Sequence, residues 1–256
     1  MARVTFLGRV FPIVLNVSCG FSENAEITWN WPEMELDLHF KTYINLSSVK
    51  VQCDFDGDYR EEYFNEFYKR SIDLARAVVN LVAFSTGCGL TVVLEKFIRT
   101  DGSSSPIILK DEALAAHCTS YALSPDRIKD LSAVMQIVLT DTAIFRLLND
   151  LIEAITLTHV APVHCGRVID GINRIISPGE DRKKAWSLMR RALNLSQTYL
   201  ELISKHATGP RHGDPAFISG KDVAEVTRRT WVIMNRFLEY RKQGNQQLKA
   251  PEFPNL

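Results

Sequence analysis

The chain has 256 residues, of which 46% are hydrophobic, and its 30 basic and 30 acidic side chains cancel at neutral pH. A chain of this length and composition can bury a sizeable core, in one large domain or two small ones. A net charge of zero excludes a net electrostatic attraction of the whole protein to nucleic acid or to an anionic membrane. Such binding therefore needs a local patch of basic side chains. No apolar run reaches about 18 residues, so we expect no membrane span.

The cysteines and histidines indicate neither a disulfide framework nor a metal site. The five cysteines are scattered, without Cys-x-x-Cys or zinc-ligand spacing, which is typical of reduced thiols in a cytoplasmic protein. His159, His164 and Cys165 are the nearest approach to a ligand set, but the two histidines bracket Pro162 and do not share a helix face. Nucleotide-binding, zincin and hydrolase motifs are also absent. The sequence therefore predicts no metal and no cofactor.

Residues 1–115 are predicted to form an α+β domain. Short runs rich in β-branched and aromatic residues predict strands at Arg9–Ser18, Ala25–Asn30, Glu35–Asn45, Ser48–Phe55, Leu90–Ile98 and Ile107–Leu109. Between them, apolar positions at helical spacing predict a helix from Asp58 to Ser85, which Gly87 stops. We expect an antiparallel sheet with this helix packed on one face.

Residues 116–256 are predicted to form an antiparallel helical bundle. Pro125 marks the first turn of a helix whose apolar stripe continues to Ile155, a length of roughly 45 Å. Further helices are predicted to start after Pro162 and at three serines with capping spacing, namely Ser177, Ser196 and Ser219. The tail from Gly244 onward contains two prolines and is not expected to be helical.

The candidate site is the segment Thr208–Pro215, whose glycines and prolines predict a rigid polar turn between the last two helices. A histidine beside an arginine can transfer a proton while the guanidinium binds phosphate and stabilises developing charge. We therefore predict His212 and Arg211 as catalytic residues. The C-terminal third is rich in basic side chains, and those predicted to contact phosphate or RNA are Lys205, His206, Arg190 and Arg191.

This layout resembles the HEPN superfamily of prokaryotic RNA-associated and defence-linked proteins. The resemblance covers residues 126–243 and rests on a penultimate helix ending in Gly209-Pro210-Arg211-His212-Gly213, followed by a capped final helix. It implies a homodimer and a metal-independent endoribonuclease with an Arg-x4-6-His motif. Here the motif is degenerate, because the positions where its arginine belongs hold Ala207, His206 and Lys205. Lys205 supplies charge but not the planar fork of an arginine.

Two functions remain open from the sequence. The first is a HEPN-like RNA-binding protein, with or without cleavage, linked to prokaryotic defence or stress. The alternative is a non-catalytic protein-interaction or sensing module, in which the basic side chains form a solvated helix face and Arg211 pairs within its turn or with a helix end.

Overall fold

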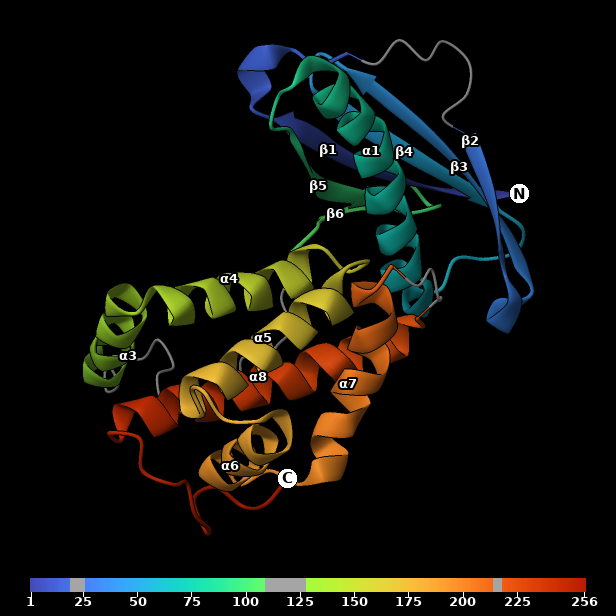
Figure 1. Cartoon of the computed structure of the whole chain (residues 1–256). Coiled ribbons are helices and arrows are strands. Elements are labelled where there is room, and N and C mark those ends of the chain that lie inside the picture. The colour runs from blue at the N-terminus through green and yellow to red at the C-terminus, as the bar shows by residue number, and fades with distance from the viewer. Residues whose placement is uncertain (19–25, 109–127, 214–217) are drawn as a thin grey trace. The chain divides into compact units, whose positions relative to one another are not determined.

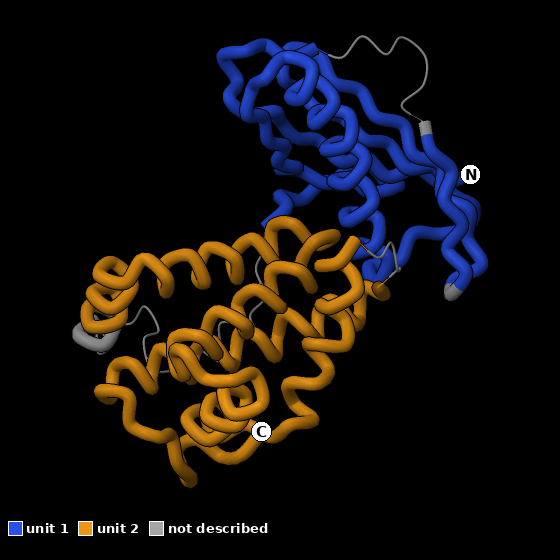
Figure 2. Tube along the Cα trace, viewed as in Figure 1, with its two compact units in different colours: residues 1–108 blue, residues 109–256 orange. Residues whose placement is uncertain are grey.

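The computed structural model of the chain describes residues 1–18, 26–108, 128–213 and 218–256. The chain divides into two compact units, Met1–Ile108 and Leu109–Leu256 (Figure 2). The boundary predicted between residues 115 and 116 lies outside the described residues. A sheet with a packed helix makes up the first unit and helices the second, which confirms the predicted α+β class (Figure 1).

The first unit is a six-stranded antiparallel sheet in the order β2-β3-β4-β1-β5-β6. The strands are β1 (Ala2–Phe11), β2 (Glu26–Trp31), β3 (Leu36–Asn45), β4 (Ser48–Phe55), β5 (Thr91–Ile98) and β6 (Ser104–Pro106). Strand β1 is central, with Ala2 opposite Phe55 on β4 and Phe11 opposite Thr91 on β5. The N-terminal strand therefore lies between two strands that come later in the sequence.

Two predicted strands were wrong in position. The first strand starts at Ala2 and ends at Phe11, not Arg9–Ser18, because Pro12 has no N–H for the ladder and Ile13–Leu15 form a short 3-10 helix. The strand that pairs with the outer edge of β5 is β6 (Ser104–Pro106), so the predicted strand Ile107–Leu109, whose last residue lies outside the described residues, was placed too late. Arg99 and Ser103 close the turn with a backbone hydrogen bond of 2.9 Å, so the pairing with β5 starts earlier than the apolar run.

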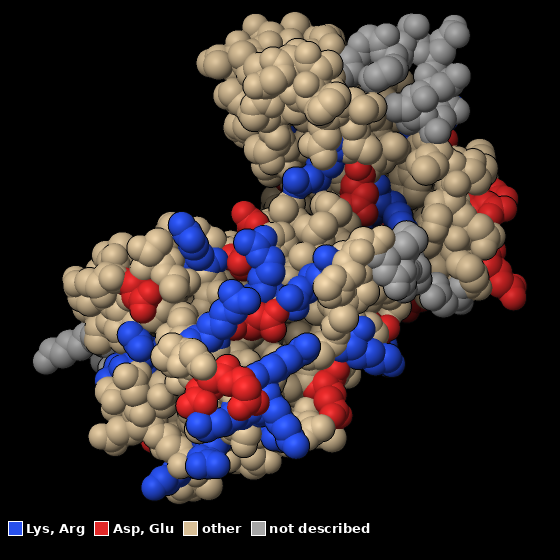
Figure 3. Space-filling view, viewed as in Figure 1, with Lys and Arg blue, Asp and Glu red and all other residues tan. Residues whose placement is uncertain are grey.

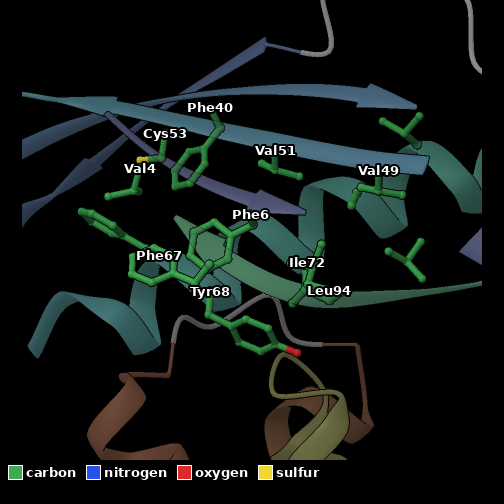
Figure 4. Packing of buried hydrophobic residues seen from close by; sticks show 14 of the residues in the cluster. Val4, Phe6, Phe40, Val49, Val51, Cys53, Phe67, Tyr68, Ile72 and Leu94 are labelled. Carbon is green, nitrogen blue, oxygen red and sulfur yellow. The ribbon is translucent and has the colours of Figure 1, made fainter. Parts of the chain in front are cut away.

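Helix α1 (Phe64–Thr86) covers one face of the sheet, as predicted, and a short 3-10 helix, η3 (Glu61–Tyr63), precedes it. Alternate side chains of the strands point toward this helix, because successive strand residues face opposite sides. Figure 4 shows side chains from β1, β3 and β4 meeting side chains of α1 in a buried apolar layer, among them Val4, Phe6, Phe40, Val51, Cys53, Phe67, Tyr68 and Ile72. The helix ends at Gly87, whose φ of 65° suits a residue without a side chain.

The second unit packs its helices around α5 (Ala161–Ile176), which contacts α4, α6, α7 and α8 (Figure 1). The other helices are α3 (Ile128–Thr140), α4 (Thr142–Thr156), α6 (Arg182–Leu193), α7 (Gln197–Arg211) and α8 (Gly220–Lys242). Ser196 and Ser219 cap α7 and α8 as predicted, each accepting a hydrogen bond from a backbone N–H three residues later. None of the described helices is long and apolar enough to cross a membrane.

The long helix expected up to Ile155 is wrong, because the chain breaks at Asp141 between α3 and α4. Asp141 has extended backbone angles, and its carboxylate accepts hydrogen bonds from the N–H groups of Ala143 and Ile144. The break changes which side chains are buried: Ile144 and Leu151 enter the core, whereas Phe145 and Ile152 of the predicted stripe are exposed. An N-capping aspartate within an apolar period therefore marks a helix start that the period alone hides.

Substituting Asp141 by alanine is expected to lower the free energy of unfolding by about 1 kcal/mol, because two N–H groups at the start of α4 lose their acceptor. Urea unfolding followed by far-ultraviolet circular dichroism measures the change. Asp141→Asn is the matched variant, since asparagine caps a helix about as well as aspartate. A loss in the asparagine variant as large as in Asp141→Ala would contradict the capping role.

The predicted capping box at Ser177 was also wrong. Asp181 is the N-cap of α6, and its carboxylate accepts from the N–H of Lys184 at 3.1 Å. Ser177 instead follows the end of α5, where its hydroxyl donates to the carbonyl oxygen of Asn173 at 2.7 Å. The residues between these two helix ends are left to line the groove described below.

The tail after α8 is non-helical as predicted, and it packs on the second unit. Arg236, which is buried on α8, donates hydrogen bonds to the carbonyl oxygens of Leu193, Asn194 and Pro254. Burial lowers the pKa of this guanidinium from its usual value. Leu248 adds a buried apolar contact. The hydrogen bonds of Arg236 therefore hold the tail against the C-terminal end of α6.

Candidate functional site

A groove of about 850 Å³ lies in the second unit, bounded by α5, α6, α7 and the segment that joins α5 to α6. Its volume is within the usual range of small-molecule sites, roughly 300–1,000 Å³. Polar and charged side chains make up much of its wall, and Ile169, Trp186 and Ile203 are its large apolar members. Among the described residues, its charged members are Asp170, Arg174, Glu180, Arg182 and Arg211, and His212 adds an imidazole.

Small residues bring α5 and α7 close together at one side of the groove. A Cβ atom on Gly166 would lie 2.8 Å from the Cβ of Ala207 and 3.1 Å from the Cδ of Arg211. Glycine on α5 and alanine on α7 therefore permit an approach that larger side chains would prevent. As a result, the side chain of Arg211 runs across α5 directly over Gly166.

Arg211 is oriented by an ion pair with Asp170, which lies one turn after Gly166 on α5. The Nη2 atom of Arg211 lies 2.6 Å from Oδ2 of Asp170, and about a third of each side chain is exposed. Because a guanidinium has five N–H donors, a carboxylate at Nη2 leaves donors for a ligand. The pair thus fixes the direction of Arg211 at the groove wall.

The predicted polar turn was wrong in extent, because α7 continues through Thr208, Gly209 and Pro210 to Arg211. Proline here costs one helical hydrogen bond, that to the carbonyl oxygen of His206, and the helix ends one residue after it. His212 follows as the C-cap, and its N–H donates to the carbonyl oxygen of Gly209 at 2.9 Å. Pro215 lies outside the described residues. Arg211 and His212 both line the groove, so the helix end brings the two predicted catalytic residues to one place.

The four residues predicted to bind phosphate do not line this groove. On α7 the groove face consists of residues 203, 204, 207, 208 and 211, which recur at helical spacing, and Lys205 and His206 lie between them. Arg190 donates from Nη1 to Oε1 of Gln197 at 3.2 Å, away from the groove, and Arg191 is exposed on α6.

Other groove residues were missed, although a pattern in the sequence points to them. Gly166, Asp170 and Arg174 follow one another at intervals of four on α5, and Arg182 and Trp186 do so on α6. Positions four apart lie on the same helix face. A small or charged residue at every fourth position, on a helix that is otherwise buried, indicates a polar groove.

The charge of the groove is moderately positive, not strongly basic. Among the described residues, three arginines line it together with Asp170 and Glu180, and Glu180 binds Lys184 at 2.8 Å. Figure 3 shows Lys and Arg side chains interleaved with Asp and Glu over the face of the second unit in view. Specific hydrogen bonds from arginines, more than a broad field, are therefore what the groove offers to an anion.

Comparison with known proteins gives a family but no activity. Residues 4–108 match the model described as "Domain of unknown function (DUF8168) N-terminal domain", and residues 131–242 match the corresponding C-terminal domain. The two matches fall on the two structural units and together take in most of the chain. No curated protein and no solved structure matches the chain. The resemblance to the HEPN superfamily stays a prediction.

Proposed function

The chain belongs to the DUF8168 family, whose two domains are both of unknown function, and we propose that it binds single-stranded RNA through the groove between α5, α6 and α7. The observation that carries the proposal is the lining of one groove by Arg174, Arg182, Arg211 and Trp186. Planar guanidinium groups bind phosphate through paired hydrogen bonds, and an indole ring stacks on an unpaired base. A volume of about 850 Å³ holds one or a few nucleotides.

The roles of the arginines differ. Arg211 is oriented by Asp170 and is the predicted phosphate contact at the wall between α5 and α7. Arg182 begins α6 directly after its N-cap, where the helix dipole also favours an anion. A catalytic role of His212 remains a prediction, because the arginine of the Arg-x4-6-His motif is missing and Lys205 does not line the groove.

Fluorescence anisotropy with a labelled single-stranded RNA, at low salt and in chelator, tests the binding. Arg211→Gln is expected to weaken RNA binding about tenfold, because the ligand loses a charge-assisted hydrogen bond worth about 1.5 kcal/mol or more. Arg191→Gln is the matched control, since it removes the same charge from an exposed position that does not line the groove. No saturable binding by wild type, or equal losses in both variants, would contradict the proposal.

Cleavage is read from the same samples by gel electrophoresis. RNA that stays intact with wild type contradicts a ribonuclease. Cleavage that His212→Ala leaves unchanged contradicts the predicted acid/base residue. Because chelator is present throughout, cleavage by a contaminating metal-dependent nuclease is suppressed.

An apolar groove elsewhere on the second unit favours the alternative function, an interaction module that pairs with a second copy of the chain. This groove, of about 320 Å³, lies between α3, α4 and α8 and is lined almost entirely by apolar side chains, namely Val134, Met135, Val138, Leu139, Leu148, Leu151, Trp231, Met234 and Leu238, with Asn235. Leu139 is 68% exposed. Contiguous apolar surface of this kind is typical of protein contacts. Light scattering of wild type beside Leu139→Asp tests the homodimer.

A further inference from the structure

We propose that Asp150, Glu153 and His164 form a binding site for one divalent transition-metal ion between α4 and α5. One carboxylate oxygen of each acidic residue and one ring nitrogen of His164 lie within 4.8 Å of one another. In the tetrahedral geometry of Zn²⁺, two ligand atoms at about 2.0–2.2 Å from the ion lie roughly 3.3–3.6 Å apart. The three groups therefore need to approach one another by about 1 Å, through changes of side-chain torsion, to share an ion.

The site is built by helical spacing on two packed helices. Asp150 and Glu153 are three residues apart on α4 and lie on one face, opposite His164 on α5. The Nδ1 atom of His164 lies 2.8 Å from Oδ1 of Asp150, and its Nε2 atom lies 3.4 Å from Oε2 of Glu153. Each ring nitrogen thus has one carboxylate beside it, and the ion takes one of these two nitrogens. Carboxylates and histidines that project inward from facing helices are the ligands with which helical bundles hold metal ions.

Burial makes this cluster different from a surface group of acids. The side chains of His164 and Asp150 are both only 10% exposed, whereas that of Glu153 is 52% exposed. Two ligands are thus held rigidly in the protein and the third faces the solvent from which an ion enters. One nitrogen and two carboxylate oxygens suit Zn²⁺ or Mn²⁺ better than a soft ion, and three protein ligands leave a position for water.

His164 is the one ligand shared with the nearest set in the sequence, His159, His164 and Cys165. Cys165 lies beside His164 in the sequence, but its sulfur points to Thr227 of α8, at 3.9 Å, and not to the cluster. The acidic residues of α4, which are remote in the sequence, complete the set instead.

Arg167 competes with an ion for Asp150. Its Nη1 atom lies 3.3 Å from Oδ1 of Asp150, and its side chain is 58% exposed, so it can turn into solvent when an ion binds. Removing this positive charge should strengthen metal binding, because the ion no longer displaces a bound guanidinium. A disturbed fold would instead weaken it. Arg167 therefore provides a test that misfolding cannot imitate.

Titration of the chelator-treated, reduced full chain with Zn²⁺ in a calorimeter tests the site. We expect one ion per chain, and Glu153→Gln should weaken binding at least tenfold while Arg167→Gln strengthens it several-fold. Glu201→Gln, an exposed position on α7, is the control and should leave the affinity unchanged. Absence of zinc binding by wild type, an unchanged affinity in Glu153→Gln, or a weaker one in Arg167→Gln would each overturn the proposal.

Discussion

Replacing Gly8 by alanine is expected to unfold most of the first unit, with a loss of about 4 kcal/mol or more in its free energy of unfolding. A Cβ atom at this position would collide with the carbonyl oxygen of Val93 and lie 2.8 Å from the Cα of Leu94. Both obstacles belong to the backbone of β5, so no change of side-chain rotamer relieves them. The register of β1 against β5 shifts between Leu7 and Gly8, and only glycine permits so close an approach there.

Hydrogen exchange followed by mass spectrometry measures this effect separately in each unit. Peptides from β1, β4 and β5 should lose protection in Gly8→Ala, whereas those from α5 and α8 should keep it. Gly89→Ala is the matched control, because a Cβ on Gly89, just before β5, would meet no atom within 4 Å. Equal protection in Gly8→Ala and wild type would show that the two strands are not packed as described.

Much of the first unit could be predicted because local signals agree with the tertiary structure. The alternation in Leu36–Asn45 matches a strand with one face on the core, and Gly87 ends α1 where predicted. Local signals failed for the strands whose predicted positions were wrong. Arg9–Ser18 has the composition of a strand, but Pro12 cannot donate to the ladder and the sheet uses Ala2–Phe11 instead. Which residues form the first strand is decided by their pairing with β4 and β5, which are remote in the sequence.

In the second unit, periodicity predicted that helices exist but not where they begin. The stripe from Leu131 to Ile155 continues through Asp141, and only the capping hydrogen bonds of its carboxylate reveal two helices. At the candidate site, composition drew attention to Arg211 and His212, which the groove includes. It also drew attention to Arg190 and Lys205, which lie elsewhere, because the number of basic residues in a segment does not show which helix face they occupy.

The groove itself depends on contacts that no local pattern reveals, and Gly166 is the clearest of them. Gly166→Ala is expected to lower the free energy of unfolding of the second unit by about 1–3 kcal/mol, since its methyl group would lie 2.8 Å from Ala207 and 3.1 Å from Arg211. Helix α7 must move away from α5, and Arg211 with it. We therefore expect RNA affinity to fall by more than tenfold, more than for Arg211→Gln, because a whole wall of the groove shifts.

Gly171→Ala separates this effect from simple destabilisation. It lies on the same helix, but its Cβ would collide with the side chain of Leu147 on α4 and not with α7. Both variants should lose stability in urea, because both overpack a buried contact of α5. Only Gly166→Ala should lose RNA affinity, measured by anisotropy at a temperature where both variants are folded. If Gly171→Ala weakens RNA binding equally, the groove between α5 and α7 is not where RNA binds, and the apolar groove of α3, α4 and α8 becomes the better-supported functional surface.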